Sequence, residues 1–416
     1  MDMNTVQASN EDDLQLVGPR TYLKSNRSRQ VEVDSPEIYL DANATVRPLD
    51  CVVEAVTDAM RNSWGNPSSA HAAGVAARRV LERARDAASA LLVGVDPEDV
   101  VLTSGGTESS NAILAAAGAD ATVVISSVEH SASSVPAEFA ARRGAKVIVV
   151  PVGADGLADP EAFRRAAAQT RTAKLHVSLQ WANGETGVIQ PIADVARAVH
   201  ESRPDAVLHV DAAQAVGRIP VSVPPTGGPM AFSFSGHKLH GPQGTGVLAF
   251  SGRVGFPIAA LIVGGGQERN RRSGTQNVSG AAGLAVALEE RATGFKAAVE
   301  SMRSMRDAFE SRIVEILPHA KINGGNAPRT PNTSNIRFRG VDGMSLVSRL
   351  DALGIRCSQR SACSSGHPEP SHVLRAMGLN EQDAYASVRF SFSILNTTDE
   401  VERSAKIIGR LVRKSA

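Results

Sequence analysis

Three residues of chemically active types each follow a short apolar stretch of the chain. Lys238 ends "FSFSGHK", Asp211 lies in "HVDAAQAVG", and His130 follows "VISSVE". Ligands of α/β sheets bind at the carboxyl ends of strands, where a partly dehydrated lysine can form a Schiff base. An aspartate there can keep a pyridinium nitrogen protonated, as pyridoxal phosphate chemistry requires, and an imidazole can stack on the ring and move protons. Taken singly, each residue also has a plainer interpretation, as a surface lysine, a turn aspartate or a structural histidine.

A glycine turn precedes a predicted helix in "TSGGTESSN", residues 103–111. Backbone N–H groups and hydroxyls at the start of a helix bind phosphate. The stretch matches neither GxxxxGK[ST] nor GxGxxG, so it fits a cofactor phosphate better than ATP. The alternative is a simple turn in which Thr107 caps the helix.

The chain has three cysteines, Cys51, Cys357 and Cys363, an odd number and too few for a disulfide framework. No CxxC pair or nearby Cys/His cluster indicates structural zinc. Cys363 lies in "RSACSSG" (360–366), among small residues that are typical of a loop. A free thiol has a pKa of about 8.5, and we hypothesise that the neighbouring Arg360 lowers it electrostatically.

Short apolar strands alternate with helical patterns along most of the chain. Strands are expected at 100–104, 122–126, 146–152, 174–180, 206–214, 230–236 and 246–250, and helices from about 107 and near 133–143, 159–169 and 191–201. This alternation predicts an α/β fold with a mostly parallel sheet flanked by helices. After the glycine-rich stretch at 264–277, helices over 278–317 and scattered strands around 333–339 and 387–393 predict a smaller α+β domain.

The overall composition excludes several classes of protein. A net charge of +1 and 4% aromatic residues give no indication of direct nucleic-acid binding. No apolar run approaches the length of a membrane span, and no signal peptide is visible. The few cysteines and the missing signal peptide predict a reducing, cytoplasmic location. Residues 1–36 are polar without periodicity and are expected to be a disordered extension.

Four of these stretches, "TSGGTES", "VEHSA", "VDAAQAVG" and "SGHK", have the order and spacing of the class V branch of fold-type I pyridoxal phosphate enzymes. The resemblance is narrowed by "YLDANAT", "GNPSSAH", "WANGETG", "GGGQERNRRSGT", "SACSSG", "EPSHVLRAMG" and "VRFSFS". From about residue 38 to residue 411 the chain resembles NifS/IscS-type cysteine desulfurases. The resemblance implies a homodimer that uses pyridoxal 5′-phosphate to convert L-cysteine to L-alanine. The sulfur would pass, as a persulfide, to an acceptor protein.

The resemblance also implies a role for each matching residue. Lys238 would bind the cofactor covalently and later transfer protons, Asp211 would pair with the pyridine nitrogen, and His130 would stack on the ring. Cys363 would be the nucleophile, and Arg389 would clamp the substrate carboxylate with its planar guanidinium. The remaining cofactor contacts would come from Gln214 to the phenolic oxygen and from a phosphate-binding set of Gly106, Thr107, Ser235, His237 and, from the neighbouring subunit, Thr275. No metal is expected.

Domain boundaries are predicted from the same pattern. We expect a large domain over 51–290 that binds the cofactor, and a small C-terminal domain over 291–416 that carries the loop with Cys363. Residues 37–50 are expected to form an N-terminal arm that packs with the small domain.

The chain departs from the family pattern at two positions. Where the family has Asn-Asn-Glu, this chain reads "ANGE", which puts Gly184 at the place of the ring-contacting asparagine and leaves Asn183 or a water as candidate replacements. Where the family has "SSGSAC", this chain reads "SQRSAC" (358–363), with Arg360 in place of glycine.

Three further stretches of the sequence indicate which kind of protein accepts the sulfur. "SACSSG" and "HPEPSH" favour a dedicated branch, such as nitrogenase assembly or the DndA-type enzymes of DNA phosphorothioation. The short ending "LVRKSA" is expected to suit a different acceptor from that of housekeeping members. The acceptor is therefore expected to be an Fe–S scaffold or a phosphorothioation enzyme.

Other functions remain open at this point. A selenocysteine lyase or an aminotransferase could use the same fold, and transamination would not need Cys363. A non-catalytic scaffold of a sulfur pathway is conceivable because of Gly184. A Cys–His hydrolase is a poor alternative, because it leaves Lys238, Asp211 and the phosphate-binding turn unexplained.

Overall fold

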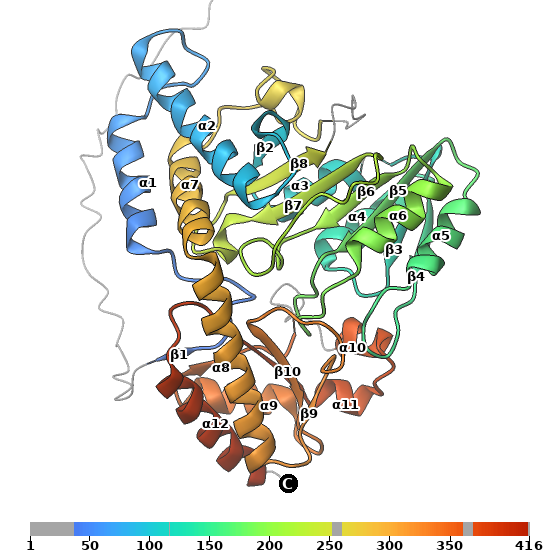
Figure 1. Ribbon diagram of the computed structural model, residues 1–416, viewed down its shortest axis with the longest axis vertical. Helices are drawn as coiled ribbons and strands as arrows, with labels where there is room; N and C mark the ends of the chain where they lie inside the picture. The colour runs from blue at the N-terminus through green and yellow to red at the C-terminus, as the bar shows by residue number, and fades with distance from the viewer. Residues whose placement is uncertain (1–36, 116, 252–259, 361–368, 415–416) are drawn as a thin grey trace, which may run out of the picture. The chain divides into compact units, whose positions relative to one another are not determined.

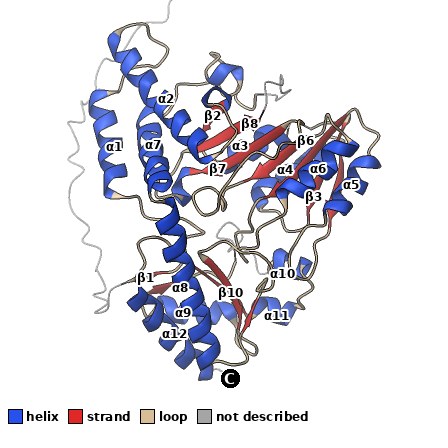
Figure 2. Cartoon of the chain, in the orientation of Figure 1, coloured by secondary structure: helices blue, strands red, loops and turns tan. Residues whose placement is uncertain are grey.

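A seven-stranded sheet with the order β2-β8-β7-β6-β5-β3-β4 dominates the computed structural model, which describes residues 37–115, 117–251, 260–360 and 369–414 (Figures 1 and 2). The strands are β2 (Val100–Thr103), β3 (Ala121–Ser126), β4 (Lys146–Val150), β5 (Lys174–Gln180), β6 (Val207–Asp211), β7 (Met230–Ser235) and β8 (Gly246–Ser251). Neighbours are parallel from β4 to β7, and β8 is antiparallel to both β7 and β2. The predicted α/β fold with a mostly parallel sheet is confirmed.

Helices cover both faces of this sheet, because alternate residues of each strand point to opposite sides. α3 (Gly106–Leu114) and α4 (Ser131–Arg142) pack on one face, where Ile113 and Ala140 share a core with Val123 and Phe250. The opposite face packs against α2 (Ala72–Leu91), α5 (Pro160–Ala168), α6 (Ile192–Ser202) and α7 (Val278–Thr293), and α1 (Asp50–Asn62) lies on α7. The apolar character of the strands thus follows from burial on two sides.

A second hydrophobic core surrounds a three-stranded antiparallel sheet with the order β12-β10-β9. Its elements are α8 (Phe295–Ile316), β9 (Lys321–Ile322), β10 (Thr333–Arg337), α9 (Gly343–Asp351), β12 (Ser387–Ser391) and α12 (Thr398–Arg413), and the short helices α10 (His372–Ala376) and α11 (Glu381–Tyr385) lie between α9 and β12 in the chain. Phe309 packs against Phe390 and Phe392 with ring centroids 5.0 and 5.4 Å apart, a usual spacing for aromatic pairs.

The N-terminal arm is part of this second core. β1 (Ile38–Tyr39) pairs in parallel with β11 (Ile355–Arg356), and the side chains of Ile38 and Leu40 are buried among the residues of the second core. Residues 37–416 nevertheless form one compact unit. The domain boundaries at 50 and 290 therefore stay predictions.

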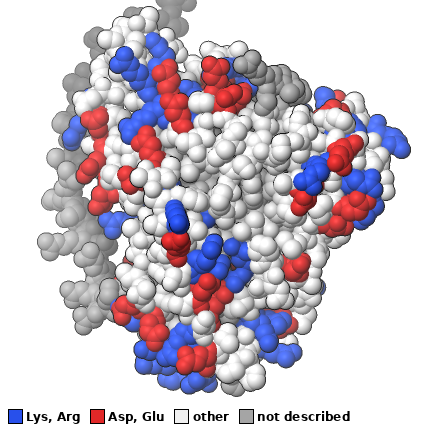
Figure 3. Space-filling view, in the orientation of Figure 1, with Lys and Arg blue, Asp and Glu red and all other residues white. Residues whose placement is uncertain are grey.

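Acidic and basic side chains are interspersed on the face of the molecule shown in Figure 3. None of the helices in the described ranges is long and apolar enough to cross a membrane. Within the same ranges, no three His, Cys, Asp or Glu side chains are grouped so that they could hold a metal ion.

Candidate active site

Two cavities that share lining residues lie at the carboxyl edge of the large sheet. β6 ends at Asp211, and β7 runs directly into a 3₁₀ turn over Gly236–Lys238. The smaller cavity has a volume of about 100 Å³ and the larger about 320 Å³, and both are lined by His130 and Lys238. The smaller is also lined by Gly106, Thr107, Asp211, Ser235 and His237, and the larger by Gln214 and Arg389.

Two predicted residues are not part of these cavities. Thr275 lines a separate surface recess together with Met60 and Trp64, whose side chains are exposed. Cys363 lies outside the described residues, so its role stays a prediction. All other predicted site residues line one or both cavities.

The glycine turn after β2 forms one wall of the smaller cavity. α3 begins at Gly106, whose backbone N–H donates to the Ser235 hydroxyl oxygen at 2.8 Å. Gly105 passes so close to β8 that a Cβ at Gly246 would lie 2.4 Å from the Gly105 Cα. The start of a nine-residue helix is therefore held against the cavity, where the N–H groups of a first helical turn suit a phosphate.

Two uncharged imidazoles line the smaller cavity. His130 caps α4, because its Nδ1 accepts a hydrogen bond from the backbone N–H of Ala132 at 3.1 Å. Burial, and next the positive charge of Lys238, lower the pKa of His130 to about 3 and the pKa of His237 to about 4. At neutral pH both rings therefore act as stacking or hydrogen-bonding groups rather than as cations.

Asp211 is nearly buried at the end of β6, and its Oδ1 accepts a hydrogen bond from the backbone N–H of Ala213 at 2.9 Å. A second acid, Glu129, lines the larger cavity. Burial, assisted by the charge of Asp211, raises the pKa of Glu129 to about 8. Glu129 is therefore a neutral carboxylic acid at pH 7.

Gln214 is held in a fixed orientation by two partners. Its Nε2 donates to the backbone oxygen of Asn43 at 3.1 Å, and its Oε1 accepts a hydrogen bond from the buried guanidinium of Arg218. A Cβ at Gly184 would lie 3.2 Å from the same Nε2. The position at which the family has an asparagine is therefore next to Gln214.

The side chain of Asn183, a candidate for the cofactor-ring contact, is hydrogen-bonded to the backbone of its own turn and of Val128. Its Oδ1 accepts hydrogen bonds from the backbone N–H groups of Glu185 and Thr186, each at 2.9 Å. Its Nδ2 donates to the backbone oxygen of Val128 at 3.3 Å. The side chain thus stabilises the turn after β5.

Arg389 lies in β12 at the wall of the larger cavity and is buried. Its Nη2 donates to Asp41 Oδ1 at 2.6 Å, and its Nη1 donates to the backbone oxygen of Gly184 at 3.0 Å. The guanidinium plane is therefore fixed by two acceptors. A fixed guanidinium suits the recognition of a carboxylate.

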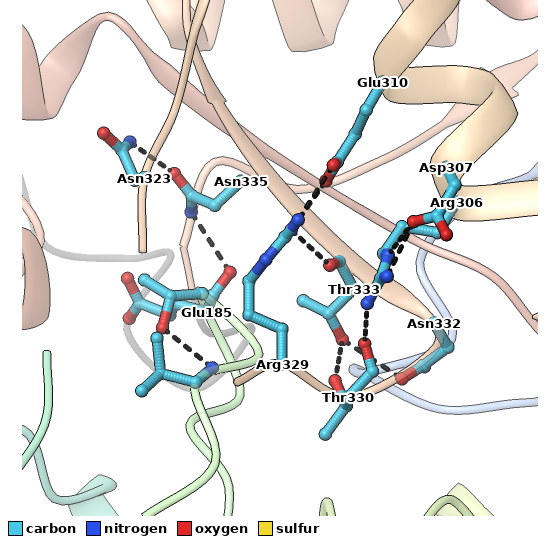
Figure 4. Close-up of polar contacts among 12 residues, drawn as sticks. Glu185, Arg306, Asp307, Glu310, Asn323, Arg329, Thr330, Asn332, Thr333 and Asn335 are labelled. Atoms are coloured by element: carbon cyan, nitrogen blue, oxygen red, sulfur yellow. Dashed lines mark hydrogen bonds and ion pairs between the residues drawn. The ribbon is translucent and has the colours of Figure 1, made fainter. Parts of the chain in front are cut away.

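A network of buried amide and hydroxyl side chains supports the turn after β5 (Figure 4). Asn335 of β10 donates from Nδ2 to the backbone oxygen of Glu185 at 3.2 Å, and its Oδ1 accepts from Asn323 at 2.7 Å. Nearby, Arg329 forms an ion pair with Glu310 at 2.6 Å. Because hydrogen-bonded buried polar groups make a site rigid, the network fixes the turn relative to β10.

The donor set of the two cavities fits pyridoxal phosphate. The start of α3 at Gly106 can receive the phosphate, and Asp211 can receive a protonated ring nitrogen. The neutral imidazole of His130 and the side chain of Lys238 line both cavities. Phosphate, ring and reactive carbon of the group each find a partner of suitable chemistry.

Several cavity residues were missed by the sequence analysis, namely Asn43, Glu129, Gln180, Glu185 and His372. Asn43 and Glu129 lie within "YLDANAT" and "VEHSA", but a lone asparagine or glutamate carries no spacing that marks it. His372 is adjacent to these residues only in the fold, where its Nε2 lies 2.9 Å from the backbone oxygen of Glu129. For all of them except Gln180, the signal that could have found them was their position inside the quoted motifs.

Known proteins share this architecture. The family model described as "Aminotransferase class-V" matches residues 38–403, so the chain belongs to the class-V aminotransferase family. A cysteine desulfurase of Gluconacetobacter diazotrophicus is 40% identical over 382 residues, which cover 91% of this chain and 94% of that protein. Within the family, the chain therefore groups with the cysteine desulfurases, and the predicted resemblance is confirmed.

Solved structures agree. A NifS-like protein has a TM-score of 0.80 and 34% identity, covering 91% of this chain and all 100% of that one. DndA from Streptomyces lividans has a TM-score of 0.66 and 32% identity, covering 85% of this chain and 99% of that one.

Proposed function

We propose that this chain is a pyridoxal phosphate-dependent cysteine desulfurase, which converts L-cysteine to L-alanine and takes up the sulfur as a persulfide on Cys363. The observation that carries the proposal is that Lys238 lines both cavities. The smaller cavity has the partners that a cofactor needs, and the larger has Arg389 for an amino-acid carboxylate. The family of the chain supports the same activity.

The cofactor would be held by residues of the smaller cavity and by Gln214 of the larger one. Gly106, Thr107, Ser235 and His237 would bind its phosphate, and Asp211 would hold its ring nitrogen protonated. His130 would stack on the ring, and Gln214 would contact the phenolic oxygen. Bound pyridoxal phosphate supplies an electron sink for the amino acid joined to it.

The substrate would be bound and oriented in the larger cavity. Arg389 would receive its α-carboxylate, which directs the side chain of the amino acid away from that wall. Lys238, which lines both cavities, would move protons at the substrate Cα. His130 is uncharged at neutral pH, so it would act as a ring-stacking group that can also accept a proton.

Sulfur transfer would require the thiolate of Cys363. It attacks the sulfur of the bound substrate, an S–S bond forms, and the C–S bond breaks. The electron pair of that bond stays with the substrate carbon, which is protonated to the methyl group of alanine. An external thiol or acceptor protein then takes the outer sulfur of the persulfide.

A homodimer would complete the site. Thr275 lies outside both cavities of its own chain, in a recess beside Met60 and Trp64, whose side chains are 63% and 75% exposed. Large exposed apolar side chains of this kind favour a protein interface. Thr275 would thus reach the phosphate site of a second copy.

The acceptor is proposed as a class. The sequence favours an Fe–S scaffold or a phosphorothioation enzyme in a reducing cytoplasm. The likeness to a NifS-like protein supports the first, and the likeness to DndA, at a lower TM-score, supports the second. Pull-down with the persulfide-loaded protein, compared with a Cys363→Ser control, would separate the two.

The activity is tested with purified protein, pyridoxal phosphate, L-cysteine and a reducing thiol. Alanine and sulfide in equal amounts are the expected products. With a keto acid added as amino-group acceptor, 3-mercaptopyruvate in place of alanine and sulfide would instead indicate an aminotransferase. Protein that stays colourless after pyridoxal phosphate is added would indicate a non-catalytic scaffold.

A further inference from the structure

Asp41 lies directly against the guanidinium of Arg389, in the arm that follows β1. Its Oδ1 accepts from Arg389 Nη2 at 2.6 Å, and its Oδ2 accepts from the Ser358 hydroxyl at 2.8 Å. The Asp41 side chain is 15% exposed and that of Arg389 is 2% exposed. Both oxygens of the carboxylate are therefore used, in a contact that is shielded from water.

The geometry of Arg389 shows what this contact does. Nη1 is committed to the backbone oxygen of Gly184 at 3.0 Å, and Nε is buried without a partner among the described residues. Asp41 and Gly184 are thus the two acceptors that set the plane of the guanidinium. Without the carboxylate, the side chain keeps one acceptor and can rotate about its terminal bonds.

Ser358 connects the same carboxylate to a third segment. Ser358 and Arg389 exchange backbone hydrogen bonds, Arg389 N–H to Ser358 O at 2.7 Å and Ser358 N–H to Arg389 O at 3.3 Å. Ser358 thus forms a β-bridge with Arg389 through its backbone and donates its hydroxyl to Asp41. Asp41 joins the arm, β12 and the segment after β11 at one point.

We propose that Asp41 is a positioning residue for the desulfurase reaction. It orients the Arg389 guanidinium so that the cavity binds ligands with an α-carboxylate more tightly than ligands without one. The proposal rests on the proposed function, because it assigns the larger cavity to an amino acid. A fixed donor pair binds a carboxylate better than a mobile one, since little orientation is lost on binding. The expected signature is a loss of carboxylate recognition rather than a general loss of binding.

The test compares two ligands on the pyridoxal phosphate-loaded protein. L-Alanine and L-alaninamide share the amine and the methyl group, but only the first has a carboxylate. Their dissociation constants are measured from the change in cofactor absorbance. In wild type, L-alanine is expected to bind more tightly, and the ratio of the two constants reports carboxylate recognition.

Asp41→Asn keeps the shape of the side chain and removes its charge. It is expected to weaken L-alanine binding by about tenfold, the size of one charge-assisted hydrogen bond, and to leave L-alaninamide within about twofold. Ser358→Ala is the matched control, because it removes one hydrogen bond to Asp41 without touching the ion pair. In Ser358→Ala, the ratio of the L-alanine and L-alaninamide dissociation constants is expected to stay within about twofold of the wild-type ratio.

Equal weakening of both ligands by Asp41→Asn, or no change in either, would overturn the proposal. If Asp41→Asn does not fold, Asp41→Glu replaces it, because the longer side chain moves the carboxylate by one methylene. The same two dissociation constants are then measured for Asp41→Glu. An unchanged ratio in Asp41→Glu then overturns the proposal. A wild-type protein that discriminates between the ligands but forms no alanine and sulfide contradicts the proposed function and leaves the role of Asp41 standing.

Discussion

The backbone N–H of Gly106 donates a hydrogen bond to the Ser235 hydroxyl oxygen at 2.8 Å, across 129 residues of sequence. This contact joins the glycine turn after β2 to β7, the strand that runs into Lys238. β8 lies between β2 and β7 in the sheet and begins at Gly246. The missing Cβ of Gly246 lets the turn approach, so the start of α3 and the strand that leads to Lys238 are held in one rigid frame.

Gly246→Ala is expected to damage cofactor binding. The added Cβ would lie 2.4 Å from the Gly105 Cα, and a backbone atom cannot move aside as a side-chain tip can. We expect the free energy of unfolding to fall by about 1–3 kcal/mol and pyridoxal phosphate to bind at least about tenfold more weakly. Chemical denaturation and an absorbance titration with the cofactor measure the two effects.

Gly105→Ala is the matched control for that variant. A Cβ at Gly105 would contact only Ser235 Oγ, at 3.6 Å, which is an ordinary van der Waals distance. Its stability and cofactor affinity are expected to stay close to those of wild type. Equal effects of the two substitutions would show that the close approach at Gly246 does not shape the site.

Gly184→Asn is expected to tighten cofactor binding. A side chain at this position would start 3.2 Å from Gln214 Nε2, at the wall of the larger cavity, and could donate a second hydrogen bond near the phenolic oxygen. One added hydrogen bond corresponds to about fivefold slower release of pyridoxal phosphate. Gly184→Ala fills the same space without a donor. If both variants retain the cofactor equally, the hydrogen-bond argument is wrong.

The pH dependence of stability should report on Glu129. Its pKa is raised to about 8 in the folded chain, mainly by burial, and the ordinary value is 4.5. The folded state therefore holds one more proton than the unfolded state between these values. The resulting stabilisation is complete below pH 4.5 and is lost as the pH rises through about 8.

Glu129→Gln tests this dependence, because glutamine keeps an acceptor for the bonds from Ser126 and Gln180 but cannot ionise. The unfolding free energy of wild type minus that of the variant should fall by about 1.4 kcal/mol per pH unit across the window and then level off. Urea unfolding at several pH values measures the difference. Glu138→Gln is the control, because it removes an exposed carboxyl that lines the same cavity. If wild type minus Glu138→Gln depends on pH with the same slope as wild type minus Glu129→Gln, the assignment to Glu129 is wrong.

The sequence and the structure agree where local pattern decides position. Asp211 and Lys238 come together because each follows a strand of one sheet, and strands of a parallel sheet present their carboxyl ends at one edge. The contact of Asp41 with Arg389 could not be predicted, because it joins a short arm to a strand 348 residues away. The packing of β1 beside β11 and the bridge between Asp41 and Ser391 bring the arm there.

Other features depend on chemistry that no spacing reveals. Arg218 and Gln214 are four residues apart, yet their hydrogen bond matters only because both side chains are buried beside Lys238. The neutral state of Glu129 likewise follows from desolvation. The task of Asn183, which fixes the turn after β5, follows from the backbone conformation of that turn.

The most direct test of the central claim follows one sulfur atom from L-cysteine to Cys363. Pyridoxal phosphate-loaded protein is mixed with one equivalent of L-cysteine without reductant, and its mass is measured intact and after peptide mapping. The account predicts one added sulfur on the peptide that contains Cys363, together with one alanine per chain, and no added sulfur in Cys363→Ser, which keeps its cofactor absorbance. Sulfur added at Cys51 or Cys357, or alanine formed by Cys363→Ser at the wild-type rate, would contradict it.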